Sequence, residues 1–503
     1  MFDKIKRLGT ETAIYGVSTV VGRFLTFILT PIYTHFLPPG DLGIVATVYA
    51  YVAFLNVVYG YGLESAYMKY ASTLELGGKK ETFSVPFISI VASSLILSVV
   101  MIWQTDPLSR LAAIPSGFES LVSYSAGILF LDAVAIVPFA ALRMEARPGT
   151  FAAIRLTSIV VNVGCNILFL FQYGMGIRGI FLSGIISSAL AVVLLLPTIV
   201  ARFTFHMPSG LYRALLKFGL PYLPSGLATM MIQVIDRPIL EAISGKAAVG
   251  IYQANYRLGI FMMLIVSMYD FAWRPFFLSH AGDPDAKPLF ARVLTYFTLM
   301  TTAIFLALSF FLSDIVRLPV FWGHPLVAAP YWGGLPIVPV VLLGYLFLGI
   351  YNNLVAGIYI VKKTRQLPLV TFAAALVNVA ANYLLIPLMG IMGAAIATLA
   401  SYAVMAVLLY VTVQRVYPVQ YEIGRIGKVA LSAAIVYALY LVVQSWPLSV
   451  LWKVLLLVLF GALMYWMKFL VPSELKAIAR LMGKRPPGAV QPSSPADPSA
   501  NGK

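Results

Sequence analysis

The chain has 503 residues, of which 60% are apolar and only 11% are charged. Its mean hydropathy of +0.89 excludes a soluble globular protein and indicates a polytopic membrane protein. The net charge of +16 suggests nucleic-acid binding as a second explanation, but the positions of the charges make that explanation unnecessary.

Fourteen segments of this sequence are apolar over roughly 20 residues or more, the length that an α-helix needs to cross a bilayer. We therefore expect an all-α polytopic membrane protein with about 14 transmembrane helices. The expected spans are 12–36, 42–62, 84–104, 120–142, 152–173, 177–200, 217–243, 248–272, 290–313, 335–360, 367–388, 391–413, 427–446 and 449–470. The last two spans are nearly continuous around Ser445, Trp446 and Pro447, so this boundary is the least distinct.

The basic residues are distributed unevenly along these spans. Of the 35 lysines and arginines, 26 fall in segments that the topology assigns to the cytoplasm and 5 in outer segments. This bias follows the positive-inside rule and predicts that both termini are cytoplasmic. The surplus charge then orients the protein against an anionic cytoplasmic leaflet, and nucleic acid is not an expected partner.

Two parts of the sequence resemble each other. Residues 161–166 (VNVGCN) precede an apolar run and the sequence GIRG, and residues 377–382 (VNVAAN) precede an apolar run and GIMG. The offset is 216 positions at the asparagines and 214 at the glycines, so the first copy has two additional residues in its turn. Residues 42–44 and 249–251 match at an offset of 207. Spans 1–6 therefore correspond to spans 7–12, which is typical of transporters built from two parallel repeats.

The repeat predicts the domain organisation. We expect a six-helix bundle at residues 1–214, a second at 215–417, and helices 13 and 14 at 418–471. Residues 472–503 are rich in Pro, Ser and Ala and are expected to form a disordered cytoplasmic tail. Prolines at the outer end of span 1, including Pro31, and beside span 7, including Pro238, predict matched kinks that favour a role in gating.

Several spans contain charged residues, although a charge at the centre of a membrane helix costs roughly 2.5–3.5 kcal/mol. The arginines are Arg23, Arg155, Arg237 and Arg257, and the carboxylates considered for ion coupling or ion pairing are Asp132 and Asp236. An intramembrane charge is a functional hypothesis by default, and arginine presents a planar fork that suits phosphate or carboxylate.

Each charge also has a structural interpretation. Arg23 either lines a hydrated cavity or forms an ion pair with Asp132. Arg155 and Arg237 either contact substrate or reach an interface or a local partner, and Asp236 is in position to neutralise Arg237. Asp132 is alternatively a carrier for a proton or Na⁺.

Two pairs of asparagines recur in the repeat. Asn162 and Asn166 in span 5, like Asn378 and Asn382 in span 11, are spaced i, i+4 and share one helix face. Such amides usually bond a neighbouring helix, so a packing role is the first interpretation and lining of the transport path the second.

No catalytic or metal-binding constellation is evident in the sequence. The four histidines are scattered, Cys165 is the single cysteine, and no phosphate-binding loop of the Walker type occurs. We therefore expect no enzyme activity, no metal and no cofactor, with coupling to a proton or Na⁺ gradient left open.

A family resemblance rests on residues 377–387 (VNVAANYLLIP) and 390–398 (GIMGAAIAT), together with Asp236 and Arg237 and residues 249–257. These motifs closely resemble those of Wzx-like oligosaccharide flippases of the multidrug/oligosaccharidyl-lipid/polysaccharide exporter superfamily. The resemblance covers about residues 8–470 and says little about the sugar.

The resemblance implies two six-helix bundles that carry a lipid-linked oligosaccharide to the outer leaflet by alternating access. It also implies that cationic side chains in the cavity hold the diphosphate and anionic sugars. Arg23 and Arg257 occupy spans in which related lipid II flippases keep such arginines. The drug-exporting branch tends to have an acidic residue early in its first bundle, whereas span 1 here has Arg23 and no carboxylate.

The functional hypothesis is a flippase for an undecaprenyl-diphosphate-linked O-antigen, capsule or exopolysaccharide unit in the bacterial cytoplasmic membrane. A polysaccharide polymerase and glycosyltransferases are its expected partners. A cation-coupled multidrug exporter and a lipid II-type flippase remain alternatives.

Overall fold

The chain is helical throughout most of the computed structural model, which describes residues 16, 19–208, 210–319 and 323–470. Within this part, twelve helices are long and apolar enough to cross a membrane, and one bent helix pair is a thirteenth candidate. The expected all-α polytopic class is therefore confirmed. The expected span at 12–36 lies partly outside the described residues, and the expected tail at 472–503 lies wholly outside them.

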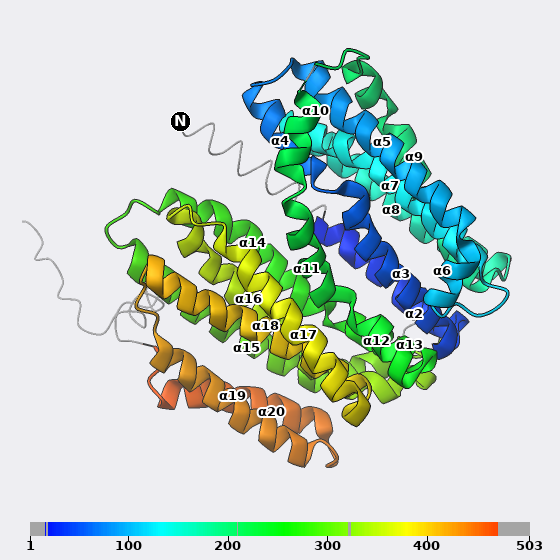
Figure 1. Cartoon of the computed structure of the whole chain (residues 1–503). Coiled ribbons are helices and arrows are strands. Elements are labelled where there is room, and N and C mark those ends of the chain that lie inside the picture. Colours follow the sequence, from blue (N-terminus) through cyan, green and yellow to red (C-terminus); the bar gives the residue numbers. More distant parts are fainter. Residues whose placement is uncertain (1–15, 17–18, 209, 320–322, 471–503) are drawn as a thin grey trace, which may run out of the picture. The chain divides into compact units, whose positions relative to one another are not determined.

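The first bundle packs its long helices side by side, with α5 against α7, α7 against α9 and α9 against α8 (Figure 1). Its helices are α2 (Leu29–Phe36), α3 (Pro39–Gly60), α4 (Leu63–Thr73), α5 (Lys79–Trp103), α6 (Thr105–Leu111), α7 (Ser120–Met144), α8 (Pro148–Ile167) and α9 (Gly176–Arg202). Pro39 and Pro148 occupy the first turns of α3 and α8, where a missing amide proton costs no helical hydrogen bond.

The second bundle packs α16 and α17 against α18, and α14 and α15 against α16 (Figure 1). Its helices are α11 (Tyr222–Val234), α12 (Asp236–Ser244), α13 (Lys246–Tyr256), α14 (Ile260–Ser279), α15 (Ala286–Arg317), α16 (Val338–Ile360), α17 (Gln366–Met389) and α18 (Ile391–Val416). Between the bundles in sequence, α10 (Leu211–Gly219) packs on α4 and α5. The expected boundary between residues 214 and 215 falls within α10.

The first helix of each repeat is interrupted at corresponding positions. The helix at 19–27 breaks at Ile28 before α2, and α11 breaks at Ile235 before α12, with a bend of 45° at the second break. Pro31 and Pro238 each follow the break by three residues and are separated by the repeat offset of 207. Because proline removes the hydrogen bond to the preceding turn, it favours a break at this point.

The repeats meet where α3 packs against α13, through two glycines that the sequence repeat relates. A Cβ atom on Gly43 would lie 1.9 Å from the carbonyl oxygen of Lys246, and one on Gly250 would lie 1.8 Å from that of Pro39. Pro39 and Lys246 are themselves separated by 207 positions, so the two contacts are reciprocal. Only glycine allows the two helix backbones to approach this closely.

The two additional residues of the first repeat lie just beyond α8. This helix ends in a π-helical turn, Leu168–Gln172, whereas α17 continues as a regular helix to Met389. A π-helical turn contains more residues than an α-helical turn, so it accommodates part of the insertion without displacing Asn162 and Asn166.

A second compact unit begins at Glu422. It contains α19 (Ile423–Val443) and α20 (Ser449–Trp466), which confirms two spans on either side of Pro447 rather than one. Lys428 at the start of α19 donates a hydrogen bond of 2.8 Å to the carbonyl oxygen of Met467, just after α20.

Candidate functional site

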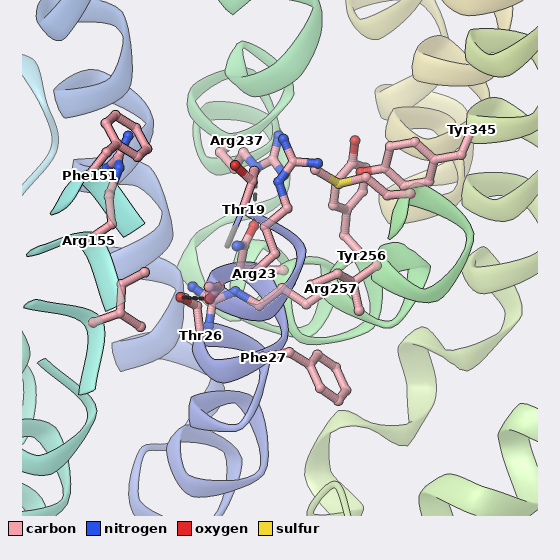
Figure 2. Close-up of a pocket in the computed structure, with 15 residues that line it drawn as sticks. Thr19, Arg23, Thr26, Phe27, Phe151, Arg155, Arg237, Tyr256, Arg257 and Tyr345 are labelled. Carbon is pink, nitrogen blue, oxygen red and sulfur yellow. Dashed lines mark hydrogen bonds between the residues drawn. The ribbon is translucent and has the colours of Figure 1, made fainter. Parts of the chain in front are cut away.

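A cavity of about 510 Å³ lies between the two bundles of the first unit. Its lining comes from the helix at 19–27, from α8, α12, α13 and α14, from the 3₁₀ turn Arg257–Gly259, and from α16 (Figure 2). All four arginines that the sequence singled out line this cavity, namely Arg23, Arg155, Arg237 and Arg257. No acidic side chain occurs among the described residues of its lining, so the cavity is strongly basic.

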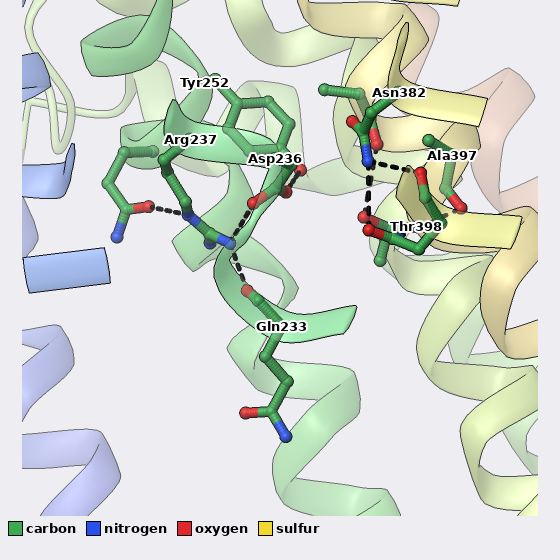
Figure 3. A network of polar contacts seen from close by, with 10 residues as sticks. Gln233, Asp236, Arg237, Tyr252, Asn382, Ala397 and Thr398 are labelled. Atoms are coloured by element: carbon green, nitrogen blue, oxygen red, sulfur yellow. Dashed lines mark hydrogen bonds and ion pairs between the residues drawn. The ribbon is translucent and has the colours of Figure 1, made fainter. Parts of the chain in front are cut away.

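Arg237 is neutralised by its neighbour in sequence. Its Nη1 lies 2.6 Å from Oδ1 of Asp236, and both side chains are buried, with 7% and 1% of their surface exposed. Tyr252 donates a hydrogen bond to the other oxygen of Asp236, and Gln253 accepts one from Nε of Arg237 at 3.1 Å (Figure 3). The ring of Tyr256 lies 4.6 Å from the Arg237 guanidinium. This network fixes Arg237 and cancels most of its charge.

Arg23 and Arg257 have no such counterion. Arg23 donates a hydrogen bond of 2.8 Å to Oγ of Ser267 on α14, and the Arg257 guanidinium lies 5.7 Å from the ring of Tyr33. Within the part of the chain that the structure describes, neither forms an ion pair, and the pair considered between Arg23 and Asp132 is absent. Two guanidinium groups in the cavity therefore keep their full charge.

Arg155 lies on α8, on the opposite side of the cavity from Arg257 (Figure 2). It has no ion pair among the described residues, and its guanidinium lies 5.4 Å from the ring of Phe139 and 6.0 Å from that of Phe151. Arg155 lines a second cavity as well, so it lies between the two cavities.

The second cavity, of about 350 Å³, lies within the first bundle. Thr26, Phe151, Arg155 and Ile159 line both cavities. Its other polar lining residues are Asn56, Glu64, Asp132, Arg143, Ser158, Asn162, Ser187 and Ser188.

The repeated asparagines have nearly the same geometry in the two bundles. Asn166 donates to the carbonyl oxygen of Asn162 at 2.8 Å and to its amide oxygen at 3.2 Å, and Asn382 donates to the same atoms of Asn378 at 2.8 and 3.1 Å. Tyr33 donates to the amide oxygen of Asn166 at 2.8 Å. Figure 3 shows Asn382 beside Ala397 and Thr398, which belong to α18.

The asparagine pairs differ in their exposure to the cavities. Asn166, Asn378 and Asn382 are almost completely buried, and Asn378 approaches the carbonyl oxygen of Ala397 on α18 at 3.5 Å. Asn162 is half-buried and lines the second cavity while donating to Ser187 on α9 at 3.3 Å. Three of the four side chains thus lie between helices, and the fourth has access to a cavity.

Sequence reasoning did not identify Ser267, Tyr345, Asn56, Glu64 or Ser188 as site residues. A hydroxyl costs too little inside a membrane helix to stand out as an arginine does. Asn56 was the detectable signal, because it is a polar amide within the apolar run of α3. No group of three or more His, Cys, Asp or Glu residues that could hold a metal occurs in the described chain.

Ten of the twelve membrane-length helices in the described chain lie in two related bundles around a basic cavity, an arrangement typical of a polytopic transporter. Residues 32–318, more than half of the chain, match the family described as "Polysaccharide biosynthesis protein", and the protein belongs to this family. No curated protein sequence matches it significantly.

Solved structures share the fold. The chain is similar to a lipid II flippase, MurJ, in an inward closed conformation, with a TM-score of 0.73 and 17% identity over 90% of this chain and 99% of that one. An inward-facing multidrug resistance MATE transporter of the MOP superfamily gives a TM-score of 0.61 at 14% identity, over 78% and 94% of the two chains. A Vibrio cholerae MATE transporter, VcmN, gives 0.57 at 12% identity, over 82% and 97%.

Proposed function

We propose that this protein moves an undecaprenyl-diphosphate-linked oligosaccharide from the cytoplasmic to the outer leaflet of the bacterial cytoplasmic membrane. The two bundles alternate access to the cavity, and the lipid tail stays in the bilayer. Both termini lie in the cytoplasm. Glycosyltransferases supply the lipid-linked unit, which crosses the membrane before a polymerase joins such units. The match to a polysaccharide biosynthesis family supports this class of substrate, and the likeness to a lipid II flippase supports a lipid-linked one.

One observation carries the proposal: Arg23 and Arg257 line the cavity with no counterion among the described residues, and Arg155 lies at its edge. An uncompensated charge at membrane depth is costly and is usually kept for function. The diphosphate of the substrate provides the missing negative charges, and guanidinium groups bind phosphate oxygens through two parallel hydrogen bonds. Substrate binding therefore offsets the free energy that is needed to keep two uncompensated arginine charges at membrane depth.

Contacts between the bundles support a state closed at the expected outer end. Tyr331, just before α16, donates a hydrogen bond of 2.8 Å to the carbonyl oxygen of Leu37, at the end of α2. The amide of Ala328 donates to Thr34 at 3.4 Å, and the glycine contacts between α3 and α13 lie in the same region. These contacts must separate for release to the outer leaflet.

The transport cycle needs an energy source, and the membrane potential can supply it because charges move during the cycle. Moving one charge across 100 mV changes the free energy by roughly 2.3 kcal/mol. The empty cavity carries the positive charge of two uncompensated arginines, whereas the loaded cavity also carries the negative charge of the diphosphate. The empty and loaded proteins therefore respond differently to the membrane potential. Asp236 is occupied by Arg237, so it is not available for coupling to a proton or Na⁺ gradient.

Binding of bare undecaprenyl diphosphate to the purified full-length protein tests the proposal. We expect Arg23→Gln and Arg257→Gln each to lower the affinity by about tenfold or more, because a charge-assisted hydrogen bond is lost. Arg213→Gln is the matched control, since Arg213 is exposed on α10 and lines neither cavity. Equal affinity for the wild-type protein and both cavity variants would contradict the proposal.

A multidrug exporter is the alternative raised by the MATE transporters that share the fold. The basic lining opposes it, because two uncompensated arginines repel an organic cation. Ethidium efflux from cells that express the protein distinguishes the two functions. Efflux that persists in Arg23→Gln and is unaffected by undecaprenyl diphosphate would favour the exporter.

A further inference from the structure

The second cavity contains hydrogen-bonding groups that the protein itself does not use. Asp132 accepts a hydrogen bond of 2.6 Å from Ser188 at Oδ1, and no described residue donates to its Oδ2. The Asn56 side chain has no hydrogen-bond partner within the described chain, although it lines the same cavity. These acceptors and donors face open space, so they are available to a polar ligand.

The charges of this cavity balance, unlike those of the first. Glu64 forms an ion pair with Arg143, and Asp132 and Arg155 contribute one charge of each sign. An anion has no net attraction to such a lining, and a carboxylate near Oδ2 of Asp132 would be repelled. The lining therefore favours an uncharged ligand with many hydroxyl groups, which can both donate to Asp132 and accept from Asn56.

Position connects this ligand to the diphosphate. Arg155 lines both cavities, and Thr26, Phe151 and Ile159 lie at the same junction. The second cavity is therefore adjacent to the site where Arg23 and Arg257 would hold a diphosphate, within reach of a sugar attached to it. The volume of about 350 Å³ falls within the range of roughly 300–1,000 Å³ for small-molecule pockets. The rings of Phe139 and Phe151, with centroids 5.2 Å apart, offer an apolar surface to the carbon face of a sugar.

We propose that the second cavity is a sugar subsite in the first bundle, in which Asp132 and Asn56 bind an uncharged sugar of the lipid-linked oligosaccharide. This inference rests on the proposed flippase function, because the diphosphate positions the sugar. Asp132 accepts from sugar hydroxyls through Oδ2, while Ser188 holds its Oδ1 in place. The subsite selects against a uronic acid at this position.

Binding of three probes to the purified full-length protein tests the subsite: undecaprenyl diphosphate without sugar, the same lipid carrying glucose, and the same lipid carrying glucuronic acid. We expect the wild-type protein to bind the glucose lipid about tenfold more tightly than the bare diphosphate, as one or two hydrogen bonds to a charged acceptor imply. The glucuronic acid lipid should gain no such advantage. Equal affinity for all three lipids would overturn the subsite.

Two variants assign the effect to the named residues. Asp132→Asn and Asn56→Ala should each remove most of the preference for glucose and leave the affinity for bare undecaprenyl diphosphate within twofold. Ser183→Ala is the control, because Ser183 is buried on the same helix as Ser188 and, among the described residues, bonds only the carbonyl oxygen of Gly179. If Asp132→Asn does not fold, Asn56→Ala alone decides the outcome.

The results separate the subsite from the function on which it rests. A wild-type protein that binds none of the three lipids would contradict the flippase proposal itself. Bare diphosphate binding that falls equally with sugar-lipid binding in both variants would show that these residues support the fold or Arg155, and would overturn the subsite alone.

Discussion

Arg23 donates a hydrogen bond of 2.8 Å from Nη1 to Oγ of Ser267, a residue 244 positions further along the chain. Arg23 belongs to the first repeat and Ser267 to α14 of the second, so this bond joins the two bundles at a residue that lines the cavity. The hydroxyl orients the guanidinium but leaves its charge uncompensated. The role of Ser267 is therefore to position the Arg23 guanidinium, to which the substrate would bind.

Removing the hydroxyl should therefore cost less than removing the charge. We expect Ser267→Ala to lower the affinity for undecaprenyl diphosphate by about threefold, since the hydroxyl only orients the guanidinium, and Arg23→Gln by about tenfold or more, since the charged group itself is lost. Titration of the lipid against the purified variants measures both. A loss in Ser267→Ala as large as that in Arg23→Gln would indicate that Ser267 itself contacts the lipid.

The pair formed by Asp236 and Arg237 should behave as one unit. Both side chains are buried, so either single change leaves an uncompensated charge, which costs roughly 3–5 kcal/mol. We expect Asp236→Asn and Arg237→Gln each to lower the thermal unfolding temperature in detergent more than the double variant does. Additive losses in the double variant would mean that each residue has a separate role.

How far the sequence could predict the site depends on the free energy needed to place each residue type inside a membrane helix. Arginine in a membrane helix is expensive wherever it occurs, so Arg23, Arg155, Arg237 and Arg257 were identifiable one by one, and the structure brings all four to one cavity. The partner of Arg237 was also foreseeable, because Asp236 is adjacent in sequence.

Long-range partners could not be read in the same way. Ser267 lies 244 positions from Arg23, and no local pattern records that the two meet. Nor does a local pattern record that Ser188 on α9 binds Asp132 on α7, since a hydroxyl in a membrane helix satisfies itself easily on its own backbone. Such contacts depend on helix rotation and packing, which hydropathy does not determine.

The fold was predictable for a different reason. Helix length and apolar character follow from the bilayer itself, so α3 to α20 lie close to the expected spans. The apolar runs did not predict α4 and α10, two short helices at the margins of the expected spans that pack on each other. The repeat offset located Gly43 and Gly250, but their direct contact required the coordinates.

The asparagine pairs allow the packing and path interpretations to be separated. Asn378 and Asn382 are completely buried, whereas Asn162 is half-buried beside the second cavity. We expect Asn378→Ala and Asn382→Ala to lower the free energy of unfolding by roughly 0.6–2 kcal/mol each, the range for polar contacts between membrane helices. Asn162→Ala should cost less stability.

Unfolding in mixed micelles measures these differences, with Asn56→Ala as a second half-buried asparagine for comparison. If Asn378→Ala and Asn382→Ala leave stability unchanged but reduce transport of the lipid, the path interpretation is correct for the second bundle.

The reciprocal glycine contact gives a prediction about α3 and α13. An alanine Cβ at Gly43 or at Gly250 would lie within 2 Å of a carbonyl oxygen of the facing helix, so the helices must move apart. We expect Gly43→Ala and Gly250→Ala each to destabilise this closed arrangement by about 1–3 kcal/mol, the usual cost of overpacking. One displacement makes room for both side chains, so the double variant should cost less than the sum of the two.

Disulfide cross-linking between cysteines placed on α3 and α13 in a Cys165→Ala background reports the closed arrangement, and should fall in both single variants. Gly164→Ala is the control, because a Cβ there meets nothing within 4 Å. Strictly additive losses would mean that the two contacts are independent. Unchanged cross-linking in both variants would mean that α3 and α13 do not need to touch at these glycines for the expected outer end to close.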